Sequence, residues 1–260
     1  MSETAPTPDF MRRLAAAAAA ETLPRFRGQG AVTNKHAAGF DPVTEADRAA
    51  EEAIRALIRS HFPGHGILGE EFGAEGTDNS HVWVIDPIDG TRAFISGLPL
   101  WGTLVGLTVE GRAVAGMMSQ PFTGELYYAD GEGAHYEGPG GGRRLAVRPT
   151  TRLEEATLCT TTPALFDAPR RKLYDRVEAA VRLPRYGTDC YAYAMVAAGH
   201  VDLVIESGLN AYDIVALIPI IEQAGGVVTT WDGGRAEGGG DIVAAATPEL
   251  HQRALELLRG

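Results

Sequence analysis

The stretch that decides the fold is Trp83-Val84-Ile85-Asp86-Pro87-Ile88-Asp89-Gly90-Thr91. It begins within a continuous apolar run over residues 82–85, which predicts a buried strand. The run leads directly into two aspartates separated by Pro-Ile, and Pro87 and Gly90 predict a turn there. Side chains placed at the ends of strands can converge on one cleft. We therefore expect Asp86 and Asp89 to belong to a site.

Upstream of this stretch, the sequence predicts an amphipathic helix. Apolar residues recur at helical spacing over residues 49–58, and Glu51, Arg55 and Arg59 fall on the opposite side. The segment Thr44-Glu45-Ala46-Asp47 precedes this pattern and fits a capping box. The capping box places its aspartate in the first turn of the helix.

Downstream, short strands give way to alternating helices and strands. The pattern predicts an antiparallel meander of strands at 103–109, 113–118, 125–128 and 134–136, followed by a glycine-rich loop at 138–142. The second half predicts helices at 170–181, 191–198, 212–224 and 248–258, with strands near 185 and at 201–205, 227–230 and 242–245. Pro219 should kink the helix that contains it. We expect two halves, residues 1–147 and 148–260, each with helices layered on a sheet.

Composition excludes several classes of protein. With 260 residues, of which 45% are hydrophobic and 22% charged, the chain can bury a sizeable core. The net charge of −11 and the lack of a basic, aromatic-rich stripe argue against a nucleic-acid partner. An acidic protein that binds an anionic phosphate needs local positive charge, which bound metal ions can supply.

The two cysteines and the N-terminus bear on location. Two cysteines give no disulfide framework, so a reduced, cytoplasmic setting is the simpler interpretation. The run Ala15 to Ala20 loosely resembles a secretion signal, but alanine is weakly hydrophobic and Glu21 ends the run. It reads instead as an alanine-rich surface helix. No apolar run approaches the ~18 residues that a membrane span needs, so we expect no membrane partner.

Four acids are placed where their side chains can converge: Glu70, Asp86, Asp89 and Asp213. Carboxylates, carbonyls and water are the ligands of hard cations, so this set favours magnesium over zinc, and the Ile88 carbonyl could join it. The 12-residue pattern of an EF-hand is absent. Aspartyl-phosphatases of the haloacid type carry acids two residues apart, whereas these are three apart, which disfavours a phosphoaspartate intermediate.

Here the sequence resembles a known family. The apolar strand followed by Asp-Pro-x-Asp-Gly-Thr resembles the signature of the inositol monophosphatase superfamily. Three further motifs match in order: Asp41-xx-Thr44-xx-Asp47, Gly69-Glu70-Glu71, and Tyr212-Asp213 before an apolar helix ending at residues 222–226. The resemblance spans about residues 40 to 230. It implies a layered αβαβα sandwich of the sugar-phosphatase type, a homodimer, and lithium-sensitive, magnesium-dependent hydrolysis of small phosphate esters.

The resemblance also implies residue roles, with two or three Mg²⁺ ions. Glu70, Asp86 and the Ile88 carbonyl would hold the first ion, and Asp86, Asp89 and Asp213 the second. Thr91, within hydrogen-bond reach of Asp47, would orient and help to deprotonate the attacking water. Glu70 belongs to the same catalytic set. Amides around Gly90 and Thr91, next to Asp89, would hold the phosphate. Paired metals of this kind activate a nucleophile on one side and stabilise the leaving alkoxide on the other.

The second half is expected to supply the leaving-group pocket. By resemblance, Asp189 and Glu206 fall where family members contact substrate. The inositol enzymes carry a small residue at the position of Asp189. Residues 92–97, 98–103 and 189–193 instead resemble the histidinol-phosphate phosphatase branch. The sequence therefore favours histidinol phosphate as substrate. It leaves open an inositol or broad sugar phosphatase and a non-catalytic metal- or phosphate-binding protein.

Overall fold

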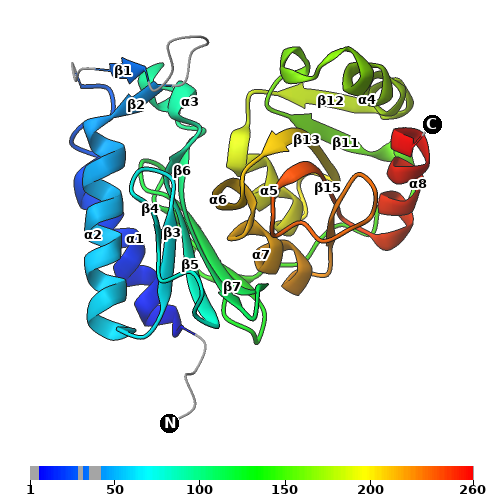
Figure 1. Ribbon diagram of the computed structural model, residues 1–260. Helices are drawn as coiled ribbons and strands as arrows, with labels where there is room; N and C mark the ends of the chain where they lie inside the picture. The colour runs from blue at the N-terminus through cyan, green and yellow to red at the C-terminus, as the bar shows by residue number, and fades with distance from the viewer. Residues whose placement is uncertain (1–5, 29–31, 35–41, 260) are drawn as a thin grey trace.

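The computed structural model describes residues 6–28, 32–34 and 42–259. They form five layers in the order helices, sheet, helices, sheet, helices (Figure 1). This order confirms the predicted αβαβα sandwich. Asp41, the first residue of one motif, lies outside the described residues.

The first layer consists of α1 (Pro8–Thr22) and α2 (Glu45–His61), which pack together on one face of the larger sheet (Figure 1). The predicted capping box is present, because Asp47 accepts from the Thr44 main chain while Thr44 caps α2. The alanine-rich helix α1 is more than a surface helix. It buries Phe10, Met11 and Leu14 in a core shared with α2 and the sheet.

The larger sheet has eight strands in the order β10-β9-β8-β7-β6-β5-β3-β4. The predicted meander is confirmed, since β5 to β10 pair antiparallel with their neighbours, whereas β3 and β5 are parallel. A separate short pair, β1 (Val32–Asn34) and β2 (Pro42–Thr44), lies beside it. The eight strands are β3 (Gly66–Gly69), β4 (Gly73–Glu75), β5 (His81–Asp89), β6 (Gly102–Val109), β7 (Arg112–Gln120), β8 (Glu125–Ala129), β9 (Ala134–Glu137) and β10 (Arg143–Arg144).

The remaining layers come from the second half of the chain. A middle layer of α5 (Asp189–Ala197), α6 (Ala211–Ile214) and α7 (Leu217–Gln223) separates the two sheets (Figure 1). The smaller sheet has the order β12-β11-β13-β15-β14 and is covered by α4 (Ala168–Ala180) and α8 (Pro248–Arg259). Its strands are β11 (Thr157–Thr160), β12 (Leu183–Tyr186), β13 (Leu203–Leu209), β14 (Val227–Thr230) and β15 (Gly240–Ala245).

Two glycines let the middle layer approach the larger sheet closely. A Cβ added at Gly116 would lie 2.2 Å from the Ala216 carbonyl oxygen, and one at Gly106 would lie 2.8 Å from the Ala216 nitrogen. Real Cβ atoms do not come this close, so only glycine fits at these two positions of β6 and β7. The close approach seats α6, and with it Asp213, against the sheet that carries Asp86.

Two expectations are corrected. The helix predicted over 212–224 is broken into α6 and α7 at residues 215–216. Pro219 has no N–H to donate to the Val215 carbonyl, so the break falls one turn before the proline. The polar side of α2 is also only partly solvated, because Glu51 and Arg55 are 0% and 3% exposed. The segment after β3 covers them and supplies main-chain partners.

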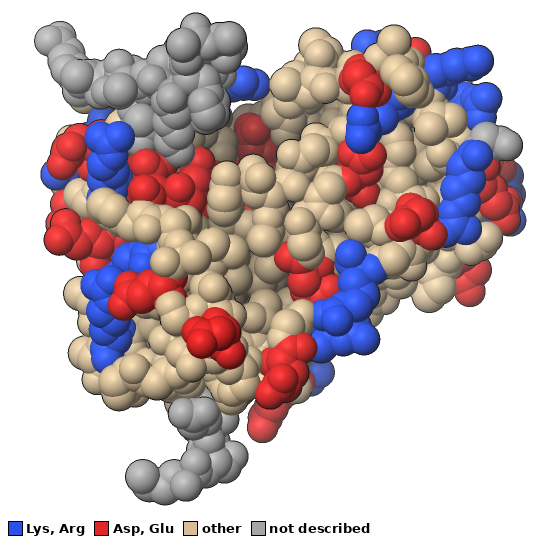
Figure 2. All heavy atoms as spheres, in the orientation of Figure 1, with Lys and Arg blue, Asp and Glu red and all other residues tan. Residues whose placement is uncertain are grey.

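The charged side chains on one face of the molecule are mixed in sign. On the face shown in Figure 2, Lys and Arg are scattered among Asp and Glu, and its described residues form no continuous basic stripe. Across the described part of the chain, none of the helices combines the length and apolar character that crossing a bilayer requires.

Candidate active site

The stretch at residues 83–91 ends β5 and begins the short helix α3 (Thr91–Ile95). The pairing of β5 with β6 shifts register between Asp86 and Asp89, so the chain bulges where the two aspartates stand. The Asp86 carboxylate accepts the Ile88 N–H at 3.0 Å, which fixes the bulge from inside. Gly90 has φ of 79°, a left-handed conformation that favours glycine.

Three carboxylates meet at this bulge. Asp86, Asp89 and Asp213 each offer one oxygen, and these oxygens lie within 4.8 Å of one another. Asp213 comes from α6, where it also forms a capping box with Asn210. The predicted convergence of acids 124 residues apart in the chain, from Asp89 to Asp213, is therefore present.

Glu70 reaches the same place from β3. Its N–H donates to the Ile85 carbonyl at 3.1 Å, which extends the parallel pairing of β3 with β5 by one residue. This pairing sets Glu70 beside Asp86, and the charge of Glu70 raises the pKa of the Asp86 carboxyl. Its role as a metal ligand remains a prediction.

The electrostatics of this cluster call for a cation. Burial, and then the charges of Glu70, Asp89 and Asp213, raise the pKa of Asp86 well above its ordinary value. Burial, followed by the charges of Asp189 and Asp213, does the same to the pKa of Asp89. Carboxylate oxygens that lie this close together and repel one another, with Asp86 buried and Asp89 and Asp213 half-buried, fit hard divalent cations such as Mg²⁺.

Thr91 and Asp47 belong to different hydrogen-bond networks. The Thr91 hydroxyl donates to the Ile88 carbonyl at 3.1 Å, the same carbonyl that was predicted to bind metal. Asp47 accepts from the Thr44 hydroxyl at 2.6 Å. Burial raises the pKa of Asp47 to about 6, against the opposing effect of these Thr44 bonds. The hydrogen bond between Thr91 and Asp47 stays a prediction.

Asp189 stands against the motif turn although it comes from α5. A Cβ added at Gly90 would lie 3.3 Å from the Asp189 Cβ, so Asp189 belongs to the site wall. Its backbone is strained, with φ of 41°, which is uncommon for a residue other than glycine. The next residue, Cys190, donates its N–H to the Asp89 carboxylate at 2.7 Å.

Glu206 lies deeper than Asp189. It is 4% exposed and accepts hydrogen bonds from the Thr161 N–H and the Thr160 hydroxyl. The Thr161 hydroxyl in turn donates to Asp189 at 3.4 Å. Burial raises the pKa of Glu206 to about 7. Thr161 thus links the two acids, and Asp189 is the one that borders the turn.

Sequence reasoning missed two of these contributors. Cys190 acts through its main-chain N–H, which no residue type reveals. Thr161 is the second of three successive threonines that begin at the last residue of β11, and only the neighbouring strand β13 shows that Glu206 lies beside it. Arg92 also acts on the site, since its charge lowers the pKa of Asp189 against the larger effect of burial.

Comparison with known proteins agrees with this geometry. A profile of the inositol monophosphatase family matches residues 5–260. The chain is 43% identical over 231 residues to the chloroplastic bifunctional phosphatase IMPL2 of Arabidopsis thaliana. The matched region covers 84% of this chain and 66% of that longer protein. It is 40% identical over 187 residues to a histidinol-phosphatase of Chlorobaculum parvum, covering 71% of each chain.

A solved structure of a relative has the same fold as this chain. An inositol monophosphatase from Zymomonas mobilis superposes with a TM-score of 0.85 at 36% identity, and the superposition covers 97% of both chains. The names of these relatives divide between histidinol phosphate and inositol phosphate. The chain belongs to the inositol monophosphatase family of phosphomonoesterases.

Proposed function

We propose that this protein is a magnesium-dependent phosphatase that hydrolyses L-histidinol phosphate to L-histidinol and phosphate. The observation that carries the metal dependence is the cluster of a buried Asp86 with the half-buried Asp89 and Asp213, whose carboxylates repel one another. A phosphate dianion would be repelled by the same charges. Bound Mg²⁺ supplies the missing positive charge and lowers the pKa of a coordinated water.

The chain's own residues then have distinct tasks. Glu70, Asp86, Asp89, Asp213 and the Ile88 carbonyl would hold two or three ions. The left-handed Gly90 keeps side chains out of the turn, so that its amides can approach phosphate oxygens.

Thr91 and Asp47 would orient the water. With a pKa of about 6, Asp47 is mostly ionised at neutral pH and still basic enough to accept a proton.

The choice of histidinol phosphate rests on Asp189. Histidinol phosphate carries an ammonium group next to its phosphate-bearing carbon, whereas inositol phosphate offers neutral hydroxyls. Asp189 borders the motif turn, and burial raises the pKa of its carboxyl, so an ammonium partner would stabilise the ionised form. Glu206 supports Asp189 through Thr161 and adds negative charge behind it.

The test compares Asp189→Asn with wild type on two esters. A charge-assisted hydrogen bond contributes roughly 1.5–3 kcal/mol, so kcat/KM for L-histidinol phosphate should fall roughly 10- to 150-fold. The uncharged alcohol of glycerol 2-phosphate makes no such bond, and its kcat/KM serves as the control that should change little. Equal losses on both esters, or a wild-type preference for inositol 1-phosphate, would exclude histidinol phosphate.

An inositol or broader sugar phosphatase is the second candidate. It is favoured by the 36% identity to the Zymomonas mobilis enzyme over nearly the whole chain. Asp189 could equally accept hydrogen bonds from ring hydroxyls. In that case inositol 1-phosphate should show the higher kcat/KM, and Asp189→Asn should affect it most.

A further inference from the structure

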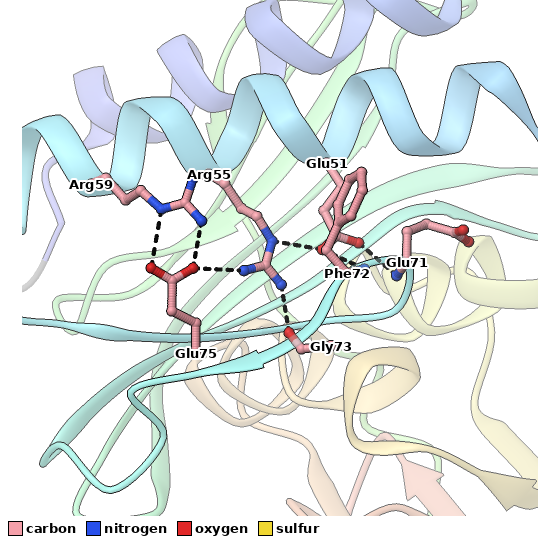
Figure 3. A network of polar contacts seen from close by, with 7 residues as sticks. All are labelled: Glu51, Arg55, Arg59, Glu71, Phe72, Gly73 and Glu75. Carbon is pink, nitrogen blue, oxygen red and sulfur yellow. Dashed lines mark hydrogen bonds and ion pairs between the residues drawn. The ribbon is translucent and has the colours of Figure 1, made fainter.

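A buried ion pair lies on α2, one layer away from the acidic cluster. Glu51 and Arg55 are one helical turn apart, and the Glu51 carboxylate accepts from the Arg55 guanidinium at 2.7 Å (Figure 3). Neither side chain is more than 4% exposed. Removing two charges from water is costly, and such a pair is weak evidence for stability by itself. Its partners indicate what else it does.

The pair is bonded to the main chain directly after Glu70. Glu51 accepts the N–H groups of Glu71 at 2.8 Å and Phe72 at 3.2 Å, and Arg55 donates to the Gly73 carbonyl at 2.5 Å (Figure 3). The three contacts fix three successive residues, two in the turn after β3 and the first residue of β4. A charged acceptor makes these hydrogen bonds stronger than neutral ones.

The residue before Glu70 is shaped by the same pair. A Cβ added at Gly69 would lie 1.9 Å from a carboxylate oxygen of Glu51 and 2.8 Å from the Arg55 guanidinium. Gly69 is therefore glycine because the ion pair occupies the space of its side chain. On the other side, Gly69 is paired with Ile85 in the β3–β5 ladder. Glu70 stands between two anchored neighbours.

We infer that Glu51 and Arg55 are positioning residues that hold the main chain on both sides of Glu70, so that the Glu70 carboxylate faces Asp86. The physical need follows from charge: Glu70 is repelled by Asp86, and an unanchored turn would relax away from the cluster. The inference rests on the proposed function, in which Glu70 holds Mg²⁺. A pair that only attached α2 to the sheet would affect stability and leave Mg²⁺ affinity unchanged.

The test uses Glu51→Gln, which keeps the shape and removes the charge. The matched control is Glu75→Gln, the same change in the outer acid, which is 53% exposed and pairs with Arg55 at 3.3 Å and with Arg59. Mg²⁺ binding is measured by calorimetry without substrate, and folding by circular dichroism. We expect folded Glu51→Gln to bind Mg²⁺ about tenfold more weakly, and Glu75→Gln to stay within twofold of wild type.

Unchanged Mg²⁺ affinity in folded Glu51→Gln would overturn the inference, as would equal losses in both variants. If wild type itself bound no Mg²⁺, the proposed function would fail and this inference with it. If wild type binds Mg²⁺ and Glu51→Gln binds it equally well, the proposed function stands and only the role of the ion pair is excluded.

A second measurement covers the case in which Glu51→Gln does not fold. Coupling between two sites is reciprocal. If the contacts of Glu51 and Arg55 with the main chain strengthen Mg²⁺ binding tenfold, Mg²⁺ must stabilise those contacts tenfold. Amide hydrogen exchange of wild type at Glu71 and Phe72 should therefore slow about tenfold on saturation with Mg²⁺. An exchange rate at these amides that is the same with and without Mg²⁺ would overturn the inference, and this measurement needs no variant.

Discussion

Replacing Asp86 by Asn should make the metal-free protein more stable while removing its response to Mg²⁺. The change is nearly isosteric, and the Asn oxygen can still accept the Ile88 N–H. It deletes one charge from a set of oxygens that lie within 4.8 Å of one another. Two unit charges at that distance repel by about 3.5 kcal/mol at an effective dielectric constant of 20.

Proton uptake by Asp86 in wild type limits how much Asp86→Asn can raise the free energy of unfolding. A carboxyl with an ordinary pKa of 3.8 cannot cost more than about 4 kcal/mol at pH 7, because beyond that it binds a proton. We therefore expect Asp86→Asn to raise the free energy of unfolding by about 2–4 kcal/mol in EDTA. With Mg²⁺ a hundredfold above Kd, wild type should gain about 2.7 kcal/mol and the variant much less.

The assay is urea unfolding at pH 7 in EDTA and in Mg²⁺. Asp78→Asn, an exposed acid outside the cluster, is the control and should stay within about 0.5 kcal/mol of wild type. An Asp86→Asn protein less stable than wild type in EDTA, or one equally stabilised by Mg²⁺, would show that Asp86 is neither destabilised by its neighbours nor needed to bind Mg²⁺.

Two further variants and one labelling experiment test other parts of the site. Burial raises the folded pKa of Glu206 from 4.5 to about 7, so wild type loses stability as pH rises through this window. Glu206→Gln should thus be more stable than wild type by up to about 3 kcal/mol at pH 8 in EDTA, with little gain at pH 4, below the unfolded pKa; a gain independent of pH would contradict this. Gly90 has φ of 79°, and the Cβ of Gly90→Ala would lie 3.3 Å from the Asp189 Cβ. This variant should lower the free energy of unfolding by about 1–2 kcal/mol in chemical denaturation, whereas an unchanged value would show that the turn is not strained. Because both acids of the Asp-x-x-Asp motif are assigned to metal, hydrolysis in oxygen-18 water should label the released phosphate within one turnover with inversion at phosphorus; a trapped phosphoprotein would argue for an aspartyl intermediate.

Much of the fold could be predicted because its signals are local. The apolar run at residues 82–85 predicts a strand, and the capping box at Thr44 marks where α2 begins. The acids of the cluster were identified because each ends or begins such an element. The substrate-binding role of Asp189 came from the family resemblance, and its contact with Gly90 was not predicted, since no local pattern joins residues 99 positions apart.

The rest could not be predicted because it depends on tertiary neighbours. Glu51 and Arg55 have the spacing of a solvated helical pair, and only the turn after β3 reveals that they are covered. Pro219 indicated a break in its helix, but the break falls at residues 215–216, where α6 and α7 pass close to β6 and β7. The hydrogen bonds from the Cys190 N–H to Asp89 and from the Thr161 N–H to Glu206 are main-chain contacts, which carry no side-chain signature.

The most direct test of the account is the rate of phosphate release by wild-type protein from L-histidinol phosphate and inositol 1-phosphate, measured as Mg²⁺ is titrated. We expect no release in EDTA, saturable activation by Mg²⁺, and the higher kcat/KM for L-histidinol phosphate. Full activity in EDTA would contradict the role of the carboxylate cluster. A higher kcat/KM for inositol 1-phosphate would contradict the role of Asp189.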